Sequence, residues 1–336
     1  MADKLKGQTL IFNNSPFIIS YATVSGPEEG KGPFASSIDK ICTDPKCGKD
    51  TWEKGEKSMV KDAISLAMKK FSIAPKDIDL MVGGDLLNQI AISNFIARDY
   101  KLPYLGIYGA CSSLVEALIF ASISMDGGFA DSVLNFSSSH YQTAERQYRT
   151  PLEYGAQYPP YKQYTVTGAG AYILGWINGH VKITAATIGK VIDLKISDPN
   201  DMGSAMAPAA ADTILQHLND TNRNVSDFDL IITGDLGKTG LKNLRSLLKE
   251  KNLELGNKLS DCGAIIFKQD AKYGSGGSGC AASSIILGSN IIPALKNNKY
   301  KRVLLIGTGA LLSPITILQK ESIPGIAHAV LIEKIN

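Results

Sequence analysis

DIDLMVGGDL at residues 77–86 and DFDLIITGDL at residues 227–236 are two versions of one segment. Six of the ten positions are identical, and the second copy follows the first by 150 residues. In each copy a short apolar run ends in Gly-Asp, the pattern of a buried strand followed by a turn. A strand and turn that recur this far along a chain indicate an internal duplication.

Four further pairs of segments occur in the same order through the chain. They are ATV (22–24) with ATI (186–188), GACSSLVEAL (109–118) with SGCAASSIIL (278–287), VLNF (133–136) with VLLI (303–306), and GAGAYIL (168–174) with IAHAVLI (326–332). Each pair is weak evidence alone, but chance is a poor explanation for five matches in one order. We therefore predict two halves, residues 1–178 and 179–336.

Each half also has the same expected order of strands and helices. Strands are predicted at 18–24, 80–82, 181–188 and 230–232, and helices at 52–71, 90–97, 207–218 and 241–248. Continuous apolar strands that alternate with helices are typical of parallel sheets covered on both faces. The helices that begin near Cys111 and Cys280 are apolar on every side, so we expect them to be buried. The prediction is an α/β fold of two pseudo-symmetric βαβαβαββ halves in five layers, α-β-α-β-α.

Composition excludes several classes of protein. The chain has 336 residues, 44% of them hydrophobic, and a formal net charge of +3. Such a chain can bury a large core and offers no extended basic surface for nucleic acid. The N-terminus lacks the apolar run of a signal peptide, and the most apolar stretch, 303–318, is broken by glycine and proline. We expect a soluble protein whose association with a membrane is peripheral.

Cysteine usage points to a reducing compartment. The five cysteines are odd in number and widely spaced, which argues against a disulfide framework: Cys42, Cys47, Cys111, Cys262 and Cys280. Cys42 and Cys47 have the spacing of half a metal site, but no second Cys or His pair follows at zinc spacing. We therefore predict no resident metal.

Cys111 follows Gly109 and Ala110 at the predicted start of the first buried helix. Amide groups in the first turn of a helix have no partner within the helix, and the helix dipole favours negative charge there. A thiol at this position is biased towards thiolate, and the amides can hold an anion. With a bound dianion we expect the thiol to be neutral.

The duplicated layout and the Cys111 turn resemble the thiolase fold and the nucleophile turn of ketoacyl synthase III. In those enzymes the cysteine works with a histidine and an asparagine from the second half, and neither is present here at the matching positions. Gly234 stands at the histidine position and Ser278 at the asparagine position. Because glycine cannot transfer a proton, the resemblance implies the scaffold of an acyl-transfer enzyme without its usual catalysis.

Several longer runs resemble the stage V sporulation protein AD family of endospore-forming bacteria. They include GDLLNQ (84–89), TAERQYR (143–149), EYGAQ (153–157), DMGSAMAPAAADT (201–213), TGALLSP (308–314) and QKESIPGIAH (319–328). The resemblance implies a non-catalytic protein that binds dipicolinic acid (pyridine-2,6-dicarboxylate), or its calcium chelate, for uptake into the developing spore. It also implies other membrane proteins of the same system as partners, a place at the inner membrane of the forespore, and no cofactor.

The expected ligand-binding residues combine the repeat turns with one basic segment. They are Cys111, Asp85, Asn88, His140, Arg146, Arg149, Ser278 and His328. A planar aromatic dianion needs cationic or amide donors and an apolar slot. Each assignment has an alternative: an ion pair for the arginines, a helix cap for Asp85 and its counterpart Asp235, and a core position for either histidine. Asp85 and Asn88 are also candidates for holding calcium.

The sequence is also compatible with two other functions. The first is a Cys-dependent acyltransferase in which Cys111 is acylated and His140 or His328 serves as the base. The second is an architectural subunit with a vestigial pocket. For any of the three, the thiolase-like resemblance implies a homodimer in which the strand at about 132–138 pairs across the interface.

Overall fold

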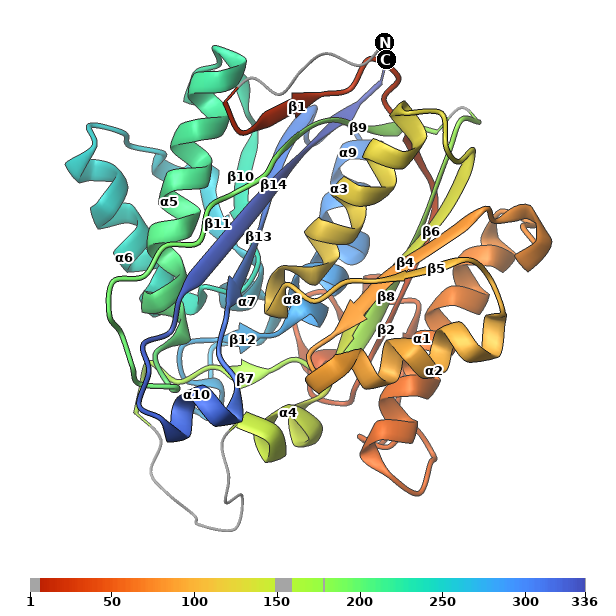
Figure 1. Cartoon of the computed structure of the whole chain (residues 1–336), viewed down its shortest axis with the longest axis horizontal. Coiled ribbons are helices and arrows are strands. Elements are labelled where there is room, and N and C mark those ends of the chain that lie inside the picture. The colour runs from red at the N-terminus through yellow and green to blue at the C-terminus, as the bar shows by residue number, and fades with distance from the viewer. Residues whose placement is uncertain (1–6, 149–158, 178, 336) are drawn as a thin grey trace.

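Ten strands form one continuous order through the molecule. The computed structural model describes residues 7–148, 159–177 and 179–335 (Figure 1). The strands of the first half are β2 (Phe17–Ser25), β4 (Leu80–Asp85), β5 (Tyr104–Gly106), β6 (Ser132–Ser139) and β8 (Gly168–Gly175). Those of the second half are β9 (Val181–Thr187), β10 (Leu230–Thr233), β11 (Leu259–Asp261), β13 (Arg302–Ala310) and β14 (Gly325–Lys334).

The two sets of five strands have the same topology. Their orders are β5-β4-β6-β8-β2 and β11-β10-β13-β14-β9, and they meet between β2 and β9, where Phe17 pairs with Lys182. In each set the first three strands pair in parallel, and the fourth pairs antiparallel with the neighbour on either side. The expectation of parallel sheets was therefore wrong, because the last strand of each half returns beside its predecessor. The division of the chain at residue 178 stays a prediction.

Helices form three layers around these strands, as Figure 1 shows. The helices α1 (Trp52–Lys70) and α2 (Ala91–Tyr100) cover the outside of the first set, and α5 (Met202–Thr221) and α6 (Gly237–Glu250) that of the second. Between the sets lie α3 (Ser113–Asp126), α8 (Cys280–Ile286) and α9 (Ile292–Lys296). The result is the expected five-layer, thiolase-like α/β fold.

The central core explains why α3 is apolar on every side. Leu114 and Leu118 of α3 are fully buried in one cluster with Val133 of β6 and Val303 of β13. Because strands of both halves pack on α3, most of this helix is buried, and only a few side chains such as Phe120 and Ile123 reach the surface. Replacing such a leucine with alanine typically costs about 2–5 kcal/mol.

Shorter elements complete the fold and reach the site. They are β1 (Thr9–Ile11), β3 (Lys40–Ile41), α4 (Tyr141–Tyr148), β7 (Tyr164–Thr165), α7 (Cys262–Ile266), β12 (Gly277–Ser278) and α10 (Pro314–Leu318). The strands β7 and β12 pair in parallel and so connect the two halves. Within the described residues, no helix combines the length and hydropathy needed to cross a bilayer.

Two sequence-based expectations about these elements are wrong. The helix expected at 207–218 begins five residues earlier, because Asp201 caps it and Pro208 is accommodated inside it. The strand expected to pair across a dimer, 132–138, is β6, which pairs with β4 on one side and β8 on the other. With both edges hydrogen-bonded within the chain, β6 cannot pair with a second subunit.

Candidate functional site

The turn that carries Cys111 lies where the two halves meet. A single 3-10 turn, Ala110–Ser112, leads into α3 and contacts β13, β14 and α8 of the second half. Cys111 is only 6% exposed. The thiol is therefore surrounded by groups from both halves.

Local sequence accounts for the shape of this turn. The Ser113 hydroxyl accepts from the Gly109 amide (3.2 Å) and donates to the Ala110 carbonyl (2.7 Å). These bonds hold Ala110 at φ 52°, a left-handed conformation that costs a residue with a side chain about 1–2 kcal/mol. A Cβ at Gly109 would lie 2.0 Å from a Glu116 carboxylate oxygen, so a larger residue would have to displace the Glu116 side chain.

A narrow cavity of about 30 Å³ opens beside Cys111 and is lined by residues of both halves. Its lining comprises Leu86, Tyr108, Ala110, Cys111, Ala144, Tyr148, Thr165, Pro199, Met202, Ser278, Ala310 and Leu312. The lining is mostly apolar, and its polar groups are a few hydroxyls. One pair of them, Tyr108 and Tyr148, is hydrogen-bonded at 2.7 Å. No lysine, arginine or histidine is among these described lining residues.

The Asp235 carboxylate of the second half lies close to the Cys111 thiol. Burial, and then the charge of Asp235, raise the pKa of Cys111 well above its usual value. The expected bias towards thiolate was therefore wrong. The dipole at the start of α3 is outweighed by burial and by a nearby carboxylate, which both disfavour a sulfur anion.

Both oxygens of the Asp235 carboxylate accept hydrogen bonds at the base of this site. The Gly279 amide at the start of α8 and the Thr308 hydroxyl of β13 each donate to its carboxylate at 2.7 Å. The Asp235 amide in turn donates to Thr308 Oγ1 at 3.0 Å. Asp235 thus ties α8 and β13 to the Cys111 turn, and burial raises its own pKa.

Asp235 is the site residue that sequence reasoning missed. It was assigned a helix cap, like Asp85, because both follow a glycine at a strand end. The shared Gly-Asp ending was a signal that the position matters, but nothing local showed that one carboxylate turns into its own half and the other towards Cys111.

Gly234 and Ser278 occupy the two positions where catalytic partners were expected. A Cβ at Gly234 would lie 3.2 Å from Thr308 Oγ1. Ser278, buried in β12 beside Thr165 of β7, lines the cavity as predicted. None of the four histidines, all of which lie within the described residues, has Cys111 among its hydrogen-bond partners.

Asp85 and Asn88 do not line the cavity. The Asp85 carboxylate accepts from the Leu87 amide (3.0 Å), the Ser93 amide (2.8 Å) and the Ser93 hydroxyl (2.7 Å). It is thus a cap for α2. Asn88 is exposed and donates its amide to Gln147. The calcium role is unsupported: the described residues contain no cluster of three or more His, Cys, Asp or Glu suited to a metal ion.

The helix after β6, α4, lines the cavity with Ala144 and Tyr148, but its basic side chains do not. His140 is buried, and its Nε2 lies 2.7 Å from the Pro45 carbonyl. Arg146 forms an ion pair with Glu53 and stacks over Trp52 of α1. Neither residue lines the cavity, and their assignment to ligand binding stays a prediction. Arg149 lies outside the described residues.

His328 packs on the opposite side of the Cys111 turn. Its Nδ1 accepts from the Gly189 amide (3.1 Å), which places the proton on Nε2, 3.2 Å from a Glu116 oxygen. Glu116 also accepts from Ser112 at 3.3 Å. His328 therefore contacts the turn through Glu116 and does not line the cavity.

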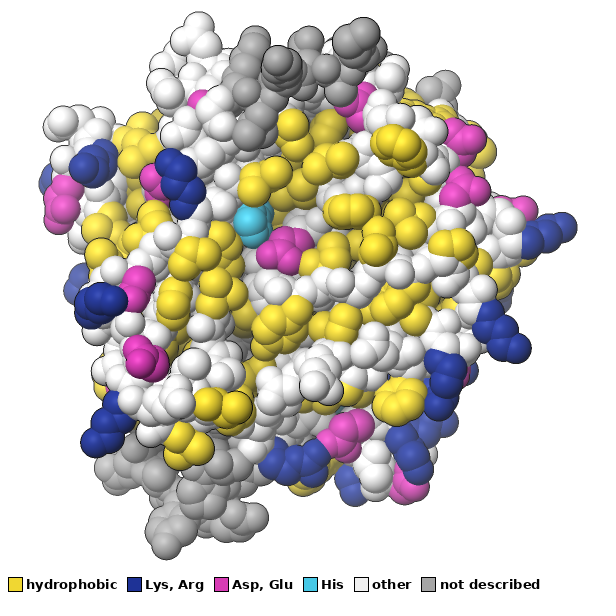
Figure 2. Space-filling model, in the orientation of Figure 1, with side chains coloured by type: hydrophobic (Ala, Val, Ile, Leu, Met, Phe, Trp, Pro, Cys, Tyr) yellow, Lys and Arg dark blue, Asp and Glu magenta, His cyan; other side chains and the backbone are white. Residues whose placement is uncertain are grey.

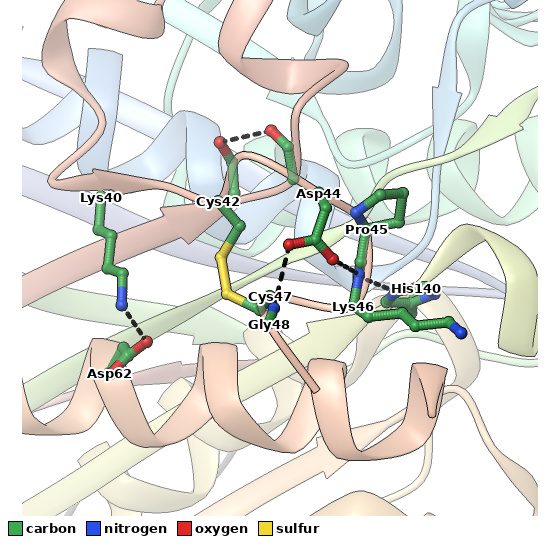
Figure 3. The surroundings of a disulfide bond; sticks show 11 residues. Lys40, Cys42, Asp44, Pro45, Lys46, Cys47, Gly48, Asp62 and His140 are labelled. Carbon is green, nitrogen blue, oxygen red and sulfur yellow. Dashed lines mark hydrogen bonds and ion pairs between the residues drawn. A yellow bond between two sulfur atoms is a disulfide. The ribbon is translucent and has the colours of Figure 1, made fainter. Parts of the chain in front are cut away.

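Cys42 and Cys47 form a disulfide, which corrects the expectation of reduced thiols throughout. The odd total concealed this pair, since Cys111, Cys262 and Cys280 are free and buried. Figure 3 shows the bridge closing the loop whose Pro45 carbonyl faces His140. Asp44 holds the same loop by accepting from the Lys46 and Gly48 amides.

Known proteins are similar to this chain at two levels. The profile described as stage V sporulation protein AD matches residues 6–333. Stage V sporulation protein AD of Bacillus subtilis (strain 168) is 47% identical over 332 residues, which cover 98% of each chain.

Solved enzyme structures share the fold at much lower identity. Acetyl-CoA acetyltransferase from Syntrophomonas wolfei aligns with a TM-score of 0.61 at 12% identity, covering 96% of this chain and all of that one. The 3-oxoacyl-[acyl-carrier-protein] synthase III from Aquifex aeolicus VF5 aligns with a TM-score of 0.57 at 13% identity, covering 95% and 99%. At such identity the likeness shows the fold alone. Its family is shown by the sequence matches: the chain belongs to the stage V sporulation protein AD family.

Proposed function

We propose that this chain is a non-catalytic receptor for dipicolinate, needed for dipicolinate uptake into the developing spore. The observation that carries the non-catalytic part is that none of the four histidines, all within the described residues, has Cys111 among its hydrogen-bond partners. Gly234 and Ser278 stand where the catalytic partners were expected. A nucleophilic thiol must lose its proton to a base, whereas this one is buried beside a carboxylate that raises its pKa. We therefore give Cys111 a structural role at the base of the cavity. Family membership supports the role in sporulation.

The charges around the cavity favour the calcium chelate over the bare dianion. The described lining has no cation, and the Asp235 carboxylate lies behind Cys111. A free dicarboxylate would be repelled by Asp235, whereas its one-to-one complex with Ca²⁺ is neutral. The apolar lining suits the pyridine ring, and the hydroxyls of Tyr108 and Ser278 are available to orient polar atoms. The ligand we propose is therefore the chelate, and the narrow cavity has to widen to admit it.

Calorimetry with two matched tryptophan variants tests the proposed ligand site. Leu312→Trp adds bulk to a half-buried residue of the cavity lining, while Leu318→Trp adds the same bulk at an 84% exposed position on α10. Dipicolinate with equimolar calcium should bind the native chain and Leu318→Trp, and binding to Leu312→Trp should fall at least tenfold. Equal binding by both variants would place the ligand elsewhere, and no heat with either ligand form would favour an architectural subunit.

Acyl transfer is the second candidate, since the fold is that of acyl-transfer enzymes and a cysteine occupies the nucleophile turn. The proposed bases do not serve it: His140 bonds to Pro45 and His328 to Glu116. Incubation with acetyl-coenzyme A and measurement of the intact mass should show no added acetyl group. A stable adduct that disappears in Cys111→Ser would establish the acyltransferase.

We further propose a homodimer and membrane-protein partners at the forespore inner membrane. Because β6 is internal, the dimer edge we propose is β5, the end strand of the first set, where Leu105 is exposed. Figure 2 shows hydrophobic side chains across the face on which β5 and α3 lie, and Tyr108, Phe120 and Ile123 are exposed there. Light scattering should report a dimer for the native chain and a monomer for Leu105→Glu. A native monomer would refute this arrangement.

A further inference from the structure

A second hollow, of about 370 Å³, lies on elements that the Cys111 cavity does not use. It is formed by β2, the end of α1, the turn before β9 and the last residue of α9. The lining residues are Ile18, Ile19, Ser20, Tyr21, Lys70, Phe71, Gly179, His180 and Lys296. Unlike the first cavity, it contains two lysines and a histidine.

The two lysines converge on one aromatic ring. The ammonium groups of Lys70 and Lys296 lie 5.0 Å and 4.9 Å from the centre of the Tyr21 ring. An aromatic face attracts cations, which explains why each lysine lies there. The two ammonium groups repel each other, however, and a negative charge between them would reduce this repulsion.

Only one of the two lysines beside Tyr21 has an acidic partner among the described residues. Lys70 pairs with Asp39 at 2.6 Å and donates to the Tyr21 carbonyl at 2.9 Å. Lys296 has no acidic partner within the described parts of the chain. Partial burial, and then the charge of Lys70, lower the pKa of Lys296. One cation in the hollow thus lacks a counter-charge.

We propose that this hollow binds a phosphate-class oxyanion, held between Lys296 and Lys70 over Tyr21 with His180 at the rim. An ammonium group offers three donors and a compact charge, which suit a tetrahedral oxyanion. The bound anion neutralises Lys296 and relieves its repulsion with Lys70. Free phosphate and a phospholipid headgroup present the same chemistry, and the site is independent of any ligand at Cys111.

The test measures two probes on the full chain at constant ionic strength. Inorganic phosphate is titrated while the side-chain NMR signal of Lys296 is followed, and vesicles of phosphatidylglycerol are compared with vesicles of phosphatidylcholine by co-sedimentation. Lys296→Gln should weaken binding about fivefold, the factor that one lysine near an anionic surface supplies. Lys69→Gln, the same charge change at an exposed neighbour outside the hollow, should have little effect, and Lys296→Arg should retain binding.

Each result decides the proposal. Saturable phosphate binding that depends on Lys296, without vesicle binding, supports a soluble ligand. Binding to phosphatidylglycerol vesicles that depends on Lys296 supports a lipid headgroup. Binding of neither probe, or equal losses in Lys69→Gln and Lys296→Gln, overturns it. Melting temperatures of all the variants show whether a loss reflects unfolding.

Discussion

Asp85 and Asp235 end the two copies of one repeated segment, yet they act in different directions. Asp85 is bonded within its own half, to the amides of Leu87 and Ser93 at the start of α2. Asp235 faces Cys111 of the other half and accepts from the Gly279 amide at the start of α8. The same position of the duplicated scaffold is therefore a helix cap in one half and part of the site in the other.

A third carboxylate makes this difference possible. Asp261, at the end of β11, accepts from the Leu236 and Gly237 amides at the start of α6. It thus supplies the cap that Asp85 supplies in the first half. Because Asp261 satisfies these amides, Asp235 is free to face Cys111. A duplicated fold can in this way gain asymmetry at the junction of its halves while its architecture stays symmetric.

The largest expected effect separates the two aspartates directly. Asp235→Asn should raise the rate at which iodoacetamide alkylates Cys111 by about tenfold or more, because each unit by which the thiol pKa falls gives tenfold more thiolate. Asp85→Asn should leave that rate unchanged. Each variant places an amide NH₂ against a buried donor and should lose about 1–3 kcal/mol of unfolding free energy.

Mass spectrometry of the alkylated peptide, with denaturation curves for both variants, checks this prediction. Rates that rise equally in the two variants would show that general loosening, and not the Asp235 charge, protects the thiol. An unchanged rate in Asp235→Asn would mean that burial alone keeps Cys111 protonated.

The fold and the Cys111 turn could be predicted because their signals are local. Apolar runs, helix periodicity and the order of the repeats are properties of short segments, and GACSS has the composition that its turn requires. The position of Ser278 near the cavity could be inferred from its place in the repeat that matches the Cys111 turn.

The remaining site residues depend on side-chain directions between distant segments. Arg146 pairs with Glu53, 93 residues away, and His140 bonds to Pro45, 95 residues away. The charge and spacing of residues 140–149 do not show whether their side chains face the cavity or other segments of the chain. The disulfide was missed for a similar reason, since counting cysteines does not show which two approach each other.

The disulfide is a second difference between the halves, because it lies in the first half and the described cysteines of the second half are free. Replacing Cys42 and Cys47 with serine should lower the unfolding free energy by about 2 kcal/mol, the loop-closure entropy of so short a loop. Urea denaturation measures the loss. Dithiothreitol should destabilise the native chain by a similar amount and leave the double variant unaffected. An equal effect of dithiothreitol on both chains would contradict a structural bridge.

Buried carboxyls in both halves make stability depend on pH. Burial raises the pKa of Glu56 to about 8 and that of Asp261 to about 7. Between pH 4.3 and 8 an unfolded glutamate is ionised while Glu56 stays protonated, so the free energy of unfolding falls as pH rises. Glu56→Gln should flatten this slope by up to about 1.4 kcal/mol per pH unit. Denaturation curves from pH 5 to 8 measure it, and an unaltered slope would assign the effect to other groups.

The smallest expected effect concerns Arg146, whose ion pair with Glu53 is solvent-exposed. Arg146→Ala should change the unfolding free energy by no more than about 1 kcal/mol, the usual worth of an exposed pair, and leave dipicolinate affinity unchanged. Arg149→Ala is the matched counterpart, since Arg149 lies outside the described residues and the sequence-based expectation that it contacts the ligand still stands. Calorimetry on both variants, with and without calcium, distinguishes them. A loss of affinity in Arg146→Ala would mean that its pair with Glu53 breaks when ligand binds, and would bring the Arg146 side chain to the cavity beside Cys111.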